Sequence, residues 1–153
     1  MFRFDRDRLK QAPASAFKLE VSVRFQDVDA AGIIFYPRAL EVCHDAYVAF
    51  LEQVGLPLHQ VLRGPWLAPV RHAEADYLKP LRFGDRVEVA LVAAHLETMP
   101  NPTEVTLGFR IAHASDGDVA ILCQTIHTFV ERKTFQRTGV PEELRKALAT
   151  VTV

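Results

Sequence analysis

The sequence predicts an α+β domain in which five antiparallel strands pack against one long helix. Residues 17–26 alternate between apolar and polar side chains, which is the pattern of a half-buried strand. Residues 37–54 carry one wide apolar stripe at helical spacing, and four more strand-like segments follow, joined largely by hairpins. Curling the sheet around the helix would bury this stripe.

The chain ahead of the helix divides into three parts. Residues 1–14 are charged and irregular, and we expect them to form a mobile arm before a single domain that spans residues 15–153. The first strand is expected over residues 17–26. Its apolar face would hold Phe17, Leu19, Val21, Val23 and Phe25. A short polar loop, residues 27–32, follows this strand.

The long helix is expected from about Pro37 to Val54. Proline suits the first helical turn because the N–H that it lacks would have no partner there, and Gly55 marks the end. The apolar stripe consists of Cys43, Ala46, Tyr47, Phe50, Leu51 and Val54. A connection punctuated by proline and glycine, residues 56–65, comes next.

The second half of the chain is predicted to be mainly strands. They are expected over residues 67–78, 87–93, 105–111 and 119–132, and a short helix over residues 141–149 closes the chain. The last strand is apolar on both faces, which favours a central place in the sheet. Long strand edges would remain unpaired. They favour pairing with a second copy, in a homodimer or a homotetramer.

Composition excludes several classes of protein. The 153 residues are 49% hydrophobic and 24% charged, which fits one compact domain. The net charge of −1 argues against a nucleic-acid partner. No apolar run is long enough to span a bilayer and the N-terminus lacks a secretory signal, so no membrane partner is expected. Cys43 and Cys123 form no CxxC motif and suit reduced core residues of a cytoplasmic protein.

Candidate catalytic groups gather in the loop before the long helix. Asp27 and Asp29 lie there, followed by Gly32. Because no Ser, Thr, Asp or Asn directly precedes Pro37, the first N–H groups of the helix lack a side-chain cap. With the helix dipole they could stabilise a carbonyl oxygen that becomes an anion. A nearby carboxylate could attack that carbonyl or activate water, and Asp29 is the candidate.

Other interpretations of this loop remain open. Asp27 and Asp29 are also typical of an ordinary polar turn, and an Asp-x-Asp pair can bind a metal–nucleotide complex. An EF-hand is excluded because Ala31 and Arg38 would occupy ligand positions. No His or Cys spacing predicts a metal site, so no metal is expected. His127, inside a strand, is expected to be structural.

The run Asp27-Val28-Asp29-Ala30-Ala31-Gly32-Ile33-Ile34-Phe35-Tyr36, followed by Pro37, resembles the signature of the hotdog-fold acyl-CoA thioesterases, in the 4-hydroxybenzoyl-CoA thioesterase branch. The likeness spans about residues 17–133 and includes the order of the strands and the helix. It implies a hotdog fold, with Asp29 as catalytic carboxylate and the Tyr36 N–H polarising the thioester carbonyl. It also implies an acyl pocket between subunits, and no metal or organic cofactor.

Two further segments, residues 42–47 and 68–72, resemble the 1,4-dihydroxy-2-naphthoyl-CoA hydrolases. The resemblance implies substrate contacts from Gly32, Phe35, His44, Val70 and His72. The family's consecutive basic residues ahead of its fourth strand, which meet CoA phosphate, are replaced here by residues 95–99. The residues expected to bind phosphate instead are Lys79, Arg82, Arg132 and Lys133, although each also suits an ordinary solvated charge.

The predicted function is therefore hydrolysis of an aromatic acyl-CoA, of the 4-hydroxybenzoyl or 1,4-dihydroxy-2-naphthoyl type, with Asp29 as nucleophile or general base. One alternative is a thioesterase for aliphatic acyl-CoA or acyl-carrier-protein substrates. Another is a module that binds acyl-CoA without hydrolysis, against which the carboxylate of Asp29 argues. Hydration of an acyl-CoA double bond ranks last, because residues 27–36 contain no histidine.

Overall fold

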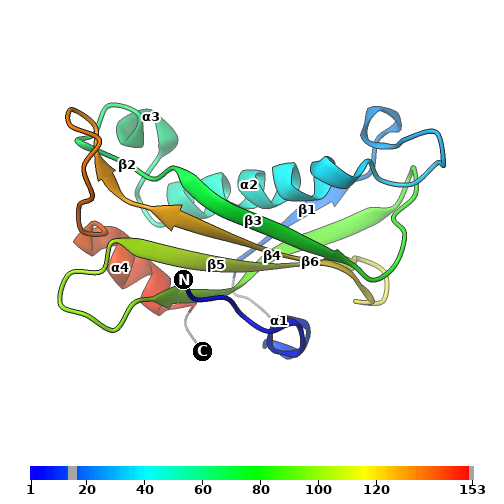
Figure 1. The fold of residues 1–153 in the computed structure, drawn as a ribbon. Coiled ribbons are helices and arrows are strands. Elements are labelled where there is room, and N and C mark those ends of the chain that lie inside the picture. Colours follow the sequence, from blue (N-terminus) through cyan, green and yellow to red (C-terminus); the bar gives the residue numbers. More distant parts are fainter. Residues whose placement is uncertain (14–16, 152–153) are drawn as a thin grey trace.

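The computed structural model describes residues 1–13 and 17–151. Five antiparallel strands form one sheet in the order β1-β4-β5-β6-β3, and this sheet wraps around the long helix α2 (Figure 1). The predicted α+β architecture is confirmed.

The strands of the main sheet are β1 (Lys18–Ser22), β3 (Val70–Tyr77), β4 (Arg86–Leu96), β5 (Glu104–His113) and β6 (Val119–Thr128). The helices are α1 (Arg6–Gln11), α2 (Tyr36–Gln53), α3 (Leu58–Val61) and α4 (Glu142–Ala149), with a 3-10 turn η1 (Phe25–Asp27) before α2. A second sheet pairs β2 (Trp66–Leu67) with β7 (Val130–Glu131).

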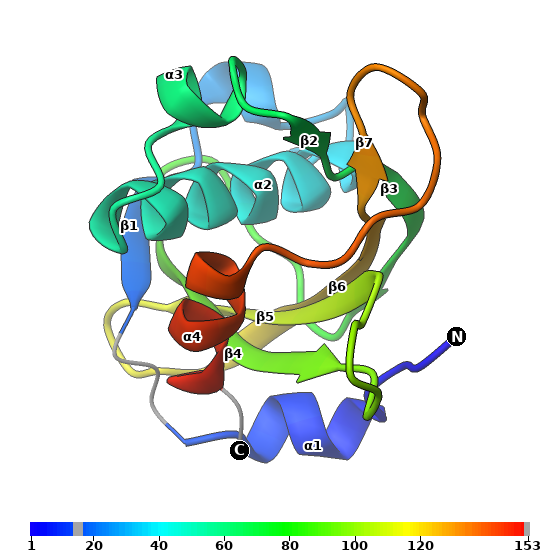
Figure 2. The ribbon, with the colours of Figure 1, turned by 90° about the vertical axis from the view of Figure 1, so that its left-hand side faces the viewer.

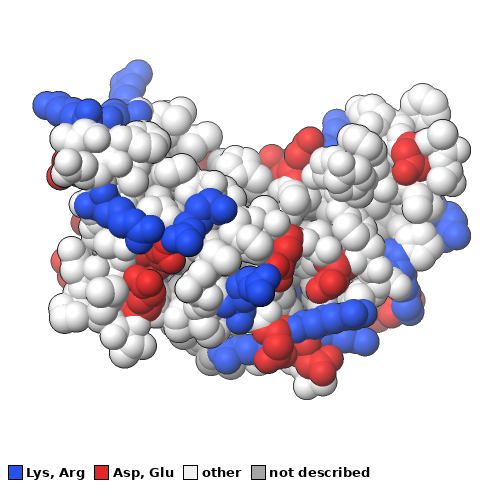
Figure 3. Space-filling view, in the orientation of Figure 1, with Lys and Arg blue, Asp and Glu red and all other residues white. Residues whose placement is uncertain are grey.

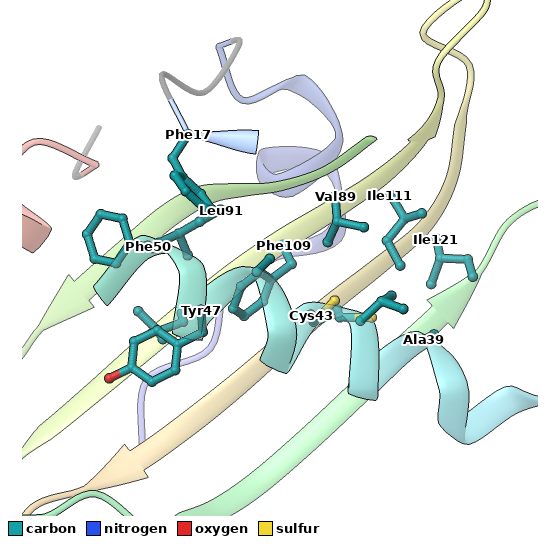
Figure 4. Packing of buried hydrophobic residues seen from close by; sticks show 14 of the residues in the cluster. Phe17, Ala39, Cys43, Tyr47, Phe50, Val89, Leu91, Phe109, Ile111 and Ile121 are labelled. Atoms are coloured by element: carbon teal, nitrogen blue, oxygen red, sulfur yellow. The ribbon is translucent and has the colours of Figure 1, made fainter. Parts of the chain in front are cut away.

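The apolar stripe of α2 packs on the inner face of the sheet, as predicted. Figure 4 shows Phe50 of α2 beside Phe17, and their ring centroids lie 5.8 Å apart. Two turns earlier, Cys43 faces Cys123 of β6, and both thiols are buried. Pro37 occupies the first turn of α2. This helix is the core around which the sheet closes.

The first strand is shorter than predicted. β1 ends at Ser22 and the chain turns through η1, so Phe25 is 78% exposed instead of buried. The cause is Asp27, whose side chain accepts a hydrogen bond from the backbone N–H of Arg24 at 2.8 Å. A side chain that binds backbone three residues earlier favours a turn over a strand.

Two of the predicted strands are divided. Residues 67–78 separate into β2 and β3 around Pro69, which has no N–H to donate to a strand ladder. Residues 119–132 separate into β6 and β7 at Phe129. β6 lies between β5 and β3, so it is an interior strand, although β5 holds the middle of the sheet. The connection over residues 56–65 contains the short helix α3.

The prediction of an irregular N-terminal segment is wrong for residues 6–11, which form α1. This helix lies on the face of the sheet opposite α2 (Figure 2). Phe4 and Leu9 are buried there, with 4% and 2% of their surface exposed. Gly108 of β5 provides the space, because a Cβ at that position would lie 2.4 Å from Leu9 Cδ2. The first residues therefore cover the outer face of the sheet.

Polar contacts hold the same segment in place. The backbone of Phe4 donates to Gln124 Oε1 at 2.8 Å, and Gln124 Nε2 donates back to the Phe4 carbonyl at 3.0 Å. Arg110 donates to the carbonyl of Ala12 at 2.7 Å, after the end of α1. The expected boundary between arm and domain, after residue 14, lies outside the described residues. No helix within the described ranges has the length and apolar character of a membrane span.

Candidate active site

Asp29 lies at the tip of a tight turn between η1 and α2. Its N–H donates to the carbonyl of Ile33, and its own carbonyl accepts the N–H of Gly32, both at 2.9 Å. Gly32 has φ +75°, a left-handed conformation that glycine adopts without a steric penalty. The N–H of Ala31 donates to Asp29 Oδ1 at 2.8 Å. The turn thus orients the Asp29 carboxylate while leaving it exposed to solvent.

Asp27 has a different role in the same loop. It is 4% exposed, and Arg38 Nε donates to its Oδ1 at 2.8 Å. The hydrogen bond from Arg24 outweighs burial and, with that from Arg38, lowers the pKa of Asp27 to about 2. The carbonyl of Asp27 accepts the N–H of Phe35 at 2.8 Å. Asp27 therefore fastens the loop to the start of α2, and both of its carboxylate oxygens are engaged.

The N-terminus of α2 is open to an incoming acceptor. Phe35 precedes the helix and provides no side-chain cap, and Pro37 follows Tyr36 in the first turn. The N–H of Tyr36 has no acceptor within the helix, because the first N–H groups of any α-helix lack one. The helix dipole adds partial positive charge at this point. An oxygen that gains negative charge would be stabilised here.

The end of β3 meets the start of α2 at this site. The hydroxyl of Tyr77 donates to the carbonyl of Tyr36. The Phe35 and Tyr36 side chains are 50% and 68% exposed. Phe35 directly precedes α2, and Gly32 belongs to the turn that holds Asp29, so these two predicted substrate contacts lie at the same end of α2 as Asp29.

A pocket of about 130 Å³ opens further along α2, between this helix and β3. His44 and Val70, both predicted substrate contacts, line it together with Leu40. Leu40 comes one turn after the first residue of α2, so the pocket begins one turn beyond the helix N-terminus. His72 is not among the lining residues, and its Nε2 lies 2.8 Å from Glu74 Oε2.

His127 also lines this pocket and has a defined tautomer. Its Nδ1 lies 3.2 Å from the carbonyl of Ala68, which can only accept, so Nδ1 carries the proton. Its Nε2 then accepts from the Thr125 hydroxyl at 3.0 Å. Burial lowers the pKa of His127 to about 4, which leaves the ring neutral at pH 7. His127 is thus both hydrogen-bonded within the fold and part of the pocket wall.

Sequence reasoning missed Tyr47, Thr125 and His127 as pocket residues. Thr125 and His127 are two residues apart on β6, and alternate residues of a strand share a face. The sequence does not specify the register of β6 with its neighbouring strands. It therefore did not indicate that the face with Thr125 and His127 lies against α2. Tyr47 was assigned to the core, and it is buried, but its ring lies 5.1 Å from that of His127 at the pocket wall.

The four basic residues predicted to bind phosphate do not lie together. Lys79 forms an ion pair with a carboxylate of the β5–β6 hairpin. Arg82 forms a backbone bridge with Ile33 and so lies next to the Asp29 turn. Arg132 and Lys133 line a separate cleft near α3. Within the described residues, no group of three or more His, Cys, Asp or Glu is placed to hold a metal ion.

A sheet wrapped around one helix, with a carboxylate near the uncapped N-terminus of that helix, is the arrangement of a hotdog-fold thioesterase. A sequence profile of the thioesterase-like superfamily matches residues 23–148, and the chain belongs to this superfamily. It is a thioester hydrolase. The hotdog fold predicted from the resemblance is confirmed.

The chain is similar to proteins named 1,4-dihydroxy-2-naphthoyl-CoA hydrolase. The protein from Synechococcus elongatus is 34% identical over 131 residues, which cover 84% of this chain and 92% of the relative. The protein from Gloeothece citriformis is 33% identical over 132 residues, with coverage of 85% and 90%. The crystal structure of a 1,4-dihydroxy-2-naphthoyl-CoA thioesterase from Synechocystis superposes with a TM-score of 0.78 at 25% identity, covering 87% of this chain and 95% of that one.

Proposed function

We propose that this protein hydrolyses an aromatic acyl-CoA, with 1,4-dihydroxy-2-naphthoyl-CoA as the first candidate substrate and 4-hydroxybenzoyl-CoA as the second. The observation that carries the proposal is the placement of Asp29, an exposed carboxylate, at the same end of α2 as the uncapped N–H of Tyr36. Among the described residues, Asp29 forms no ion pair. The names of the relatives that cover most of the chain support the naphthoyl substrate.

The proposed mechanism begins with the thioester carbonyl. Its oxygen accepts a hydrogen bond from the Tyr36 N–H and gains negative charge in the field of the helix dipole. Asp29 then attacks the carbonyl carbon, which expels CoA thiolate and leaves a mixed anhydride that water hydrolyses. Alternatively, Asp29 removes a proton from a water molecule, whose oxygen attacks the same carbon. Both routes use one carboxylate and release the acid and CoA.

The acyl group is proposed to occupy the pocket between α2 and β3. Apolar surface from Leu40 and Phe109 suits an aromatic ring, and the imidazole of His44 and the hydroxyl of Thr125 add polar atoms to the wall. Such a pocket favours a ring that carries hydroxyl groups over a plain alkyl chain, because the polar wall atoms would otherwise lose water without a replacement partner.

We also propose that the protein is a homodimer in which two copies of β3 pair. β3 is an edge strand of eight residues, and Val70 and Tyr77 at its two ends are 49% and 45% exposed. An exposed edge of this length is a template for pairing. A homotetramer is the alternative, but α1 covers the outer face of the sheet that a second dimer could contact. The buried free cysteines support the proposed cytoplasmic location.

The test is thiol release from a panel of CoA esters, with the wild type and Asp29→Asn assayed in parallel. The panel contains dihydroxynaphthoyl, hydroxybenzoyl, benzoyl, phenylacetyl and hexanoyl esters. We expect fastest turnover of a hydroxylated aromatic ester and a loss of about 10²–10⁴-fold in kcat for Asp29→Asn, since that is the range for a general base.

Three outcomes would overturn parts of the proposal. Best turnover of the hexanoyl ester, or of an acyl-carrier-protein thioester, would make the protein an aliphatic thioesterase. Binding of CoA esters without any turnover would indicate a module that does not hydrolyse them. Normal turnover by Asp29→Asn, with circular dichroism unchanged, would remove Asp29 from the mechanism.

A further inference from the structure

A second, larger cleft lies at the opposite end of α2 from Asp29. It measures about 730 Å³ and is bordered by the connection between α3 and β2 on one side and by the chain around β7 on the other. Figure 1 shows α3 and β2 at this end and the loop that leads into α2 at the other, and Figure 2 shows β7 beside β2. None of the reactions proposed above uses this cleft.

The two walls of the cleft are joined rigidly. β2 pairs with β7, so Trp66 lies opposite Glu131 in register. Arg132 Nε donates to the carbonyl of Gly64 at 2.7 Å, and Arg132 Nη2 donates to that of Val61 at 3.2 Å. The Trp66 ring packs at 5.4 Å from that of Phe129, beneath the wall. The cleft therefore exists before any ligand enters.

The cleft has an excess of positive charge. Arg63, Arg132 and Lys133 line it, against one acidic residue of the described lining, Glu131. In the described part of the chain, neither Arg63 nor Lys133 forms an ion pair with a carboxylate, whereas Glu131 accepts from the Thr134 hydroxyl at 2.8 Å. Figure 3 shows Lys and Arg side chains projecting from this end of the molecule. Clustered guanidinium and ammonium groups favour a ligand with several phosphates.

The cleft lies far from Asp29 of its own subunit, so one CoA thioester could not easily reach both places. α2 has 18 residues, so its two ends are about 27 Å apart. β3 connects the same two places, because it starts three residues after Leu67 of β2 and ends at Tyr77, whose hydroxyl meets Tyr36. In the proposed dimer a two-fold axis between the two copies of β3 makes them antiparallel. The cleft end of one subunit then lies beside the Asp29 end of the other.

We propose that this cleft, supplied by the partner subunit, binds the phosphorylated adenosine end of the CoA thioester that is cleaved at Asp29. The proposal rests on the proposed thioesterase function and on the β3 dimer. Arg63 and Lys133 pair with the diphosphate and the ribose phosphate, and the face of Trp66 packs against the adenine ring. Residues 95–99, at the end of β4 and the start of its connection to β5, lack the family's basic residues, and these are thus replaced in three dimensions by another part of the chain.

Binding is measured first, by calorimetry with free CoA and with adenosine 3′,5′-bisphosphate. The test variant is the double substitution Arg63→Gln/Lys133→Gln, and the matched control is Arg6→Gln/Lys10→Gln, which removes the same charge from α1. We expect at least a tenfold weaker affinity for both ligands in the test variant and no change in the control. Equal affinity of the test variant and the wild type would overturn the proposal.

Kinetics then separate a phosphate contact from a general disturbance. The same variants are assayed with a CoA thioester and with the N-acetylcysteamine thioester of the same acid, which has no phosphate. We expect a raised KM for the CoA ester alone. An equal loss with both esters would mean that the cleft is structural, which contradicts the proposal. If the wild type hydrolyses neither ester, the thioesterase proposal fails, while the calorimetry still tests the cleft.

Mixed dimers test whether the cleft acts on the partner subunit. Asp29→Asn chains and Arg63→Gln/Lys133→Gln chains are unfolded together, refolded and assayed at low CoA-ester concentration. With random pairing, half of the dimers contain one chain of each variant. If the cleft acts across subunits, each mixed dimer has one intact site, made of the cleft of the Asp29→Asn chain and the Asp29 of the other chain. About a quarter of wild-type activity should then return. If each cleft served its own subunit, the mixture would be no more active than its separate components. That result would overturn the proposal.

Discussion

Arg38 Nε lies 2.8 Å from Oδ1 of Asp27, and this contact holds the loop that carries Asp29 against the first turn of α2. Arg38 is two residues beyond Tyr36, so the ion pair sets the position of the helix N-terminus relative to the loop. It also distinguishes the two carboxylates of the Asp-x-Asp motif. Asp27 is enclosed by two arginines, whereas Asp29 is exposed and, among the residues that the structure describes, its carboxylate accepts from a backbone donor alone.

Asp27→Asn should weaken the fold at neutral pH but not in acid. The pKa of Asp27 is about 2 in the folded protein against an ordinary value of 3.8. A lowered pKa stabilises the fold above the ordinary value, and this contribution disappears as the pH falls from about 4 towards 2. We expect a loss of about 2 kcal/mol at pH 7. Urea unfolding at pH 7, 4 and 2.5 measures it, with the exposed Glu52→Gln as control. An unchanged midpoint at pH 7 would contradict this account.

His127→Gln should change substrate preference without changing the pH profile. Because its pKa is about 4, His127 stays neutral between pH 6 and 8 and contributes no ionisation there. We expect kcat/KM to fall about tenfold for a hydroxylated aromatic CoA ester, because the Thr125 hydroxyl, which donates to His127 Nε2, loses the acceptor that orients it in the pocket wall. One lost hydrogen bond costs about 1–1.5 kcal/mol. The benzoyl ester should be affected less. His113→Gln, on the far end of β5, is the control, and an equal loss for both esters would argue against contact between Thr125 and the ring hydroxyl.

Gly108→Ala should loosen the N-terminal segment from the sheet. The new Cβ would lie 2.4 Å from Leu9 Cδ2, so Leu9 must move. We expect faster tryptic cleavage after Arg8 and Lys10, measured by mass spectrometry, with the rest of the domain intact. Leu9→Ala removes the clashing methyl group, so the double variant should be less loosened than the sum of the single variants. Strict additivity would show that the two residues do not act on each other.

Ala73→Glu should separate the proposed dimer. Each subunit would contribute one glutamate, so two negative charges would lie close together where the two copies of β3 pair. Like charges on paired strands repel and destabilise the pairing. We expect the wild type to sediment at twice its chain mass of 17.2 kDa, and the variant to sediment as a monomer. Ser22→Glu, on the opposite edge strand β1, should leave the dimer intact. A wild-type protein that sediments at 17.2 kDa would remove the basis for catalysis across subunits.

The sequence predicted the elements whose pattern repeats over many residues. The stripe of α2 and the alternation within β4 and β5 follow from local periodicity, and all three are where they were expected. The ends of β1 and β3 were not predictable, because they depend on single contacts such as that between Asp27 and Arg24. The docked α1 was missed because Phe4 and Leu9 become core residues only against Gly108, which is about a hundred positions away.

The same distinction applies to the candidate site. Asp29 and Tyr36 are seven positions apart and were identified together from one short motif, and their catalytic roles remain predictions. The pocket and the basic cleft combine residues from distant segments, as His44 and His127 illustrate. Their association depends on strand register and on the packing of α2, neither of which a single sequence specifies.

Cys43 and Cys123 have a practical consequence. Their thiols meet between α2 and β6, with 0% and 1% of each residue exposed, and burial raises the pKa of Cys43. A thiol-specific reagent can reach them only after the helix has separated from the sheet. The rate at which the native protein reacts with such a label therefore measures how often its core opens, and no cysteine has to be engineered for the purpose.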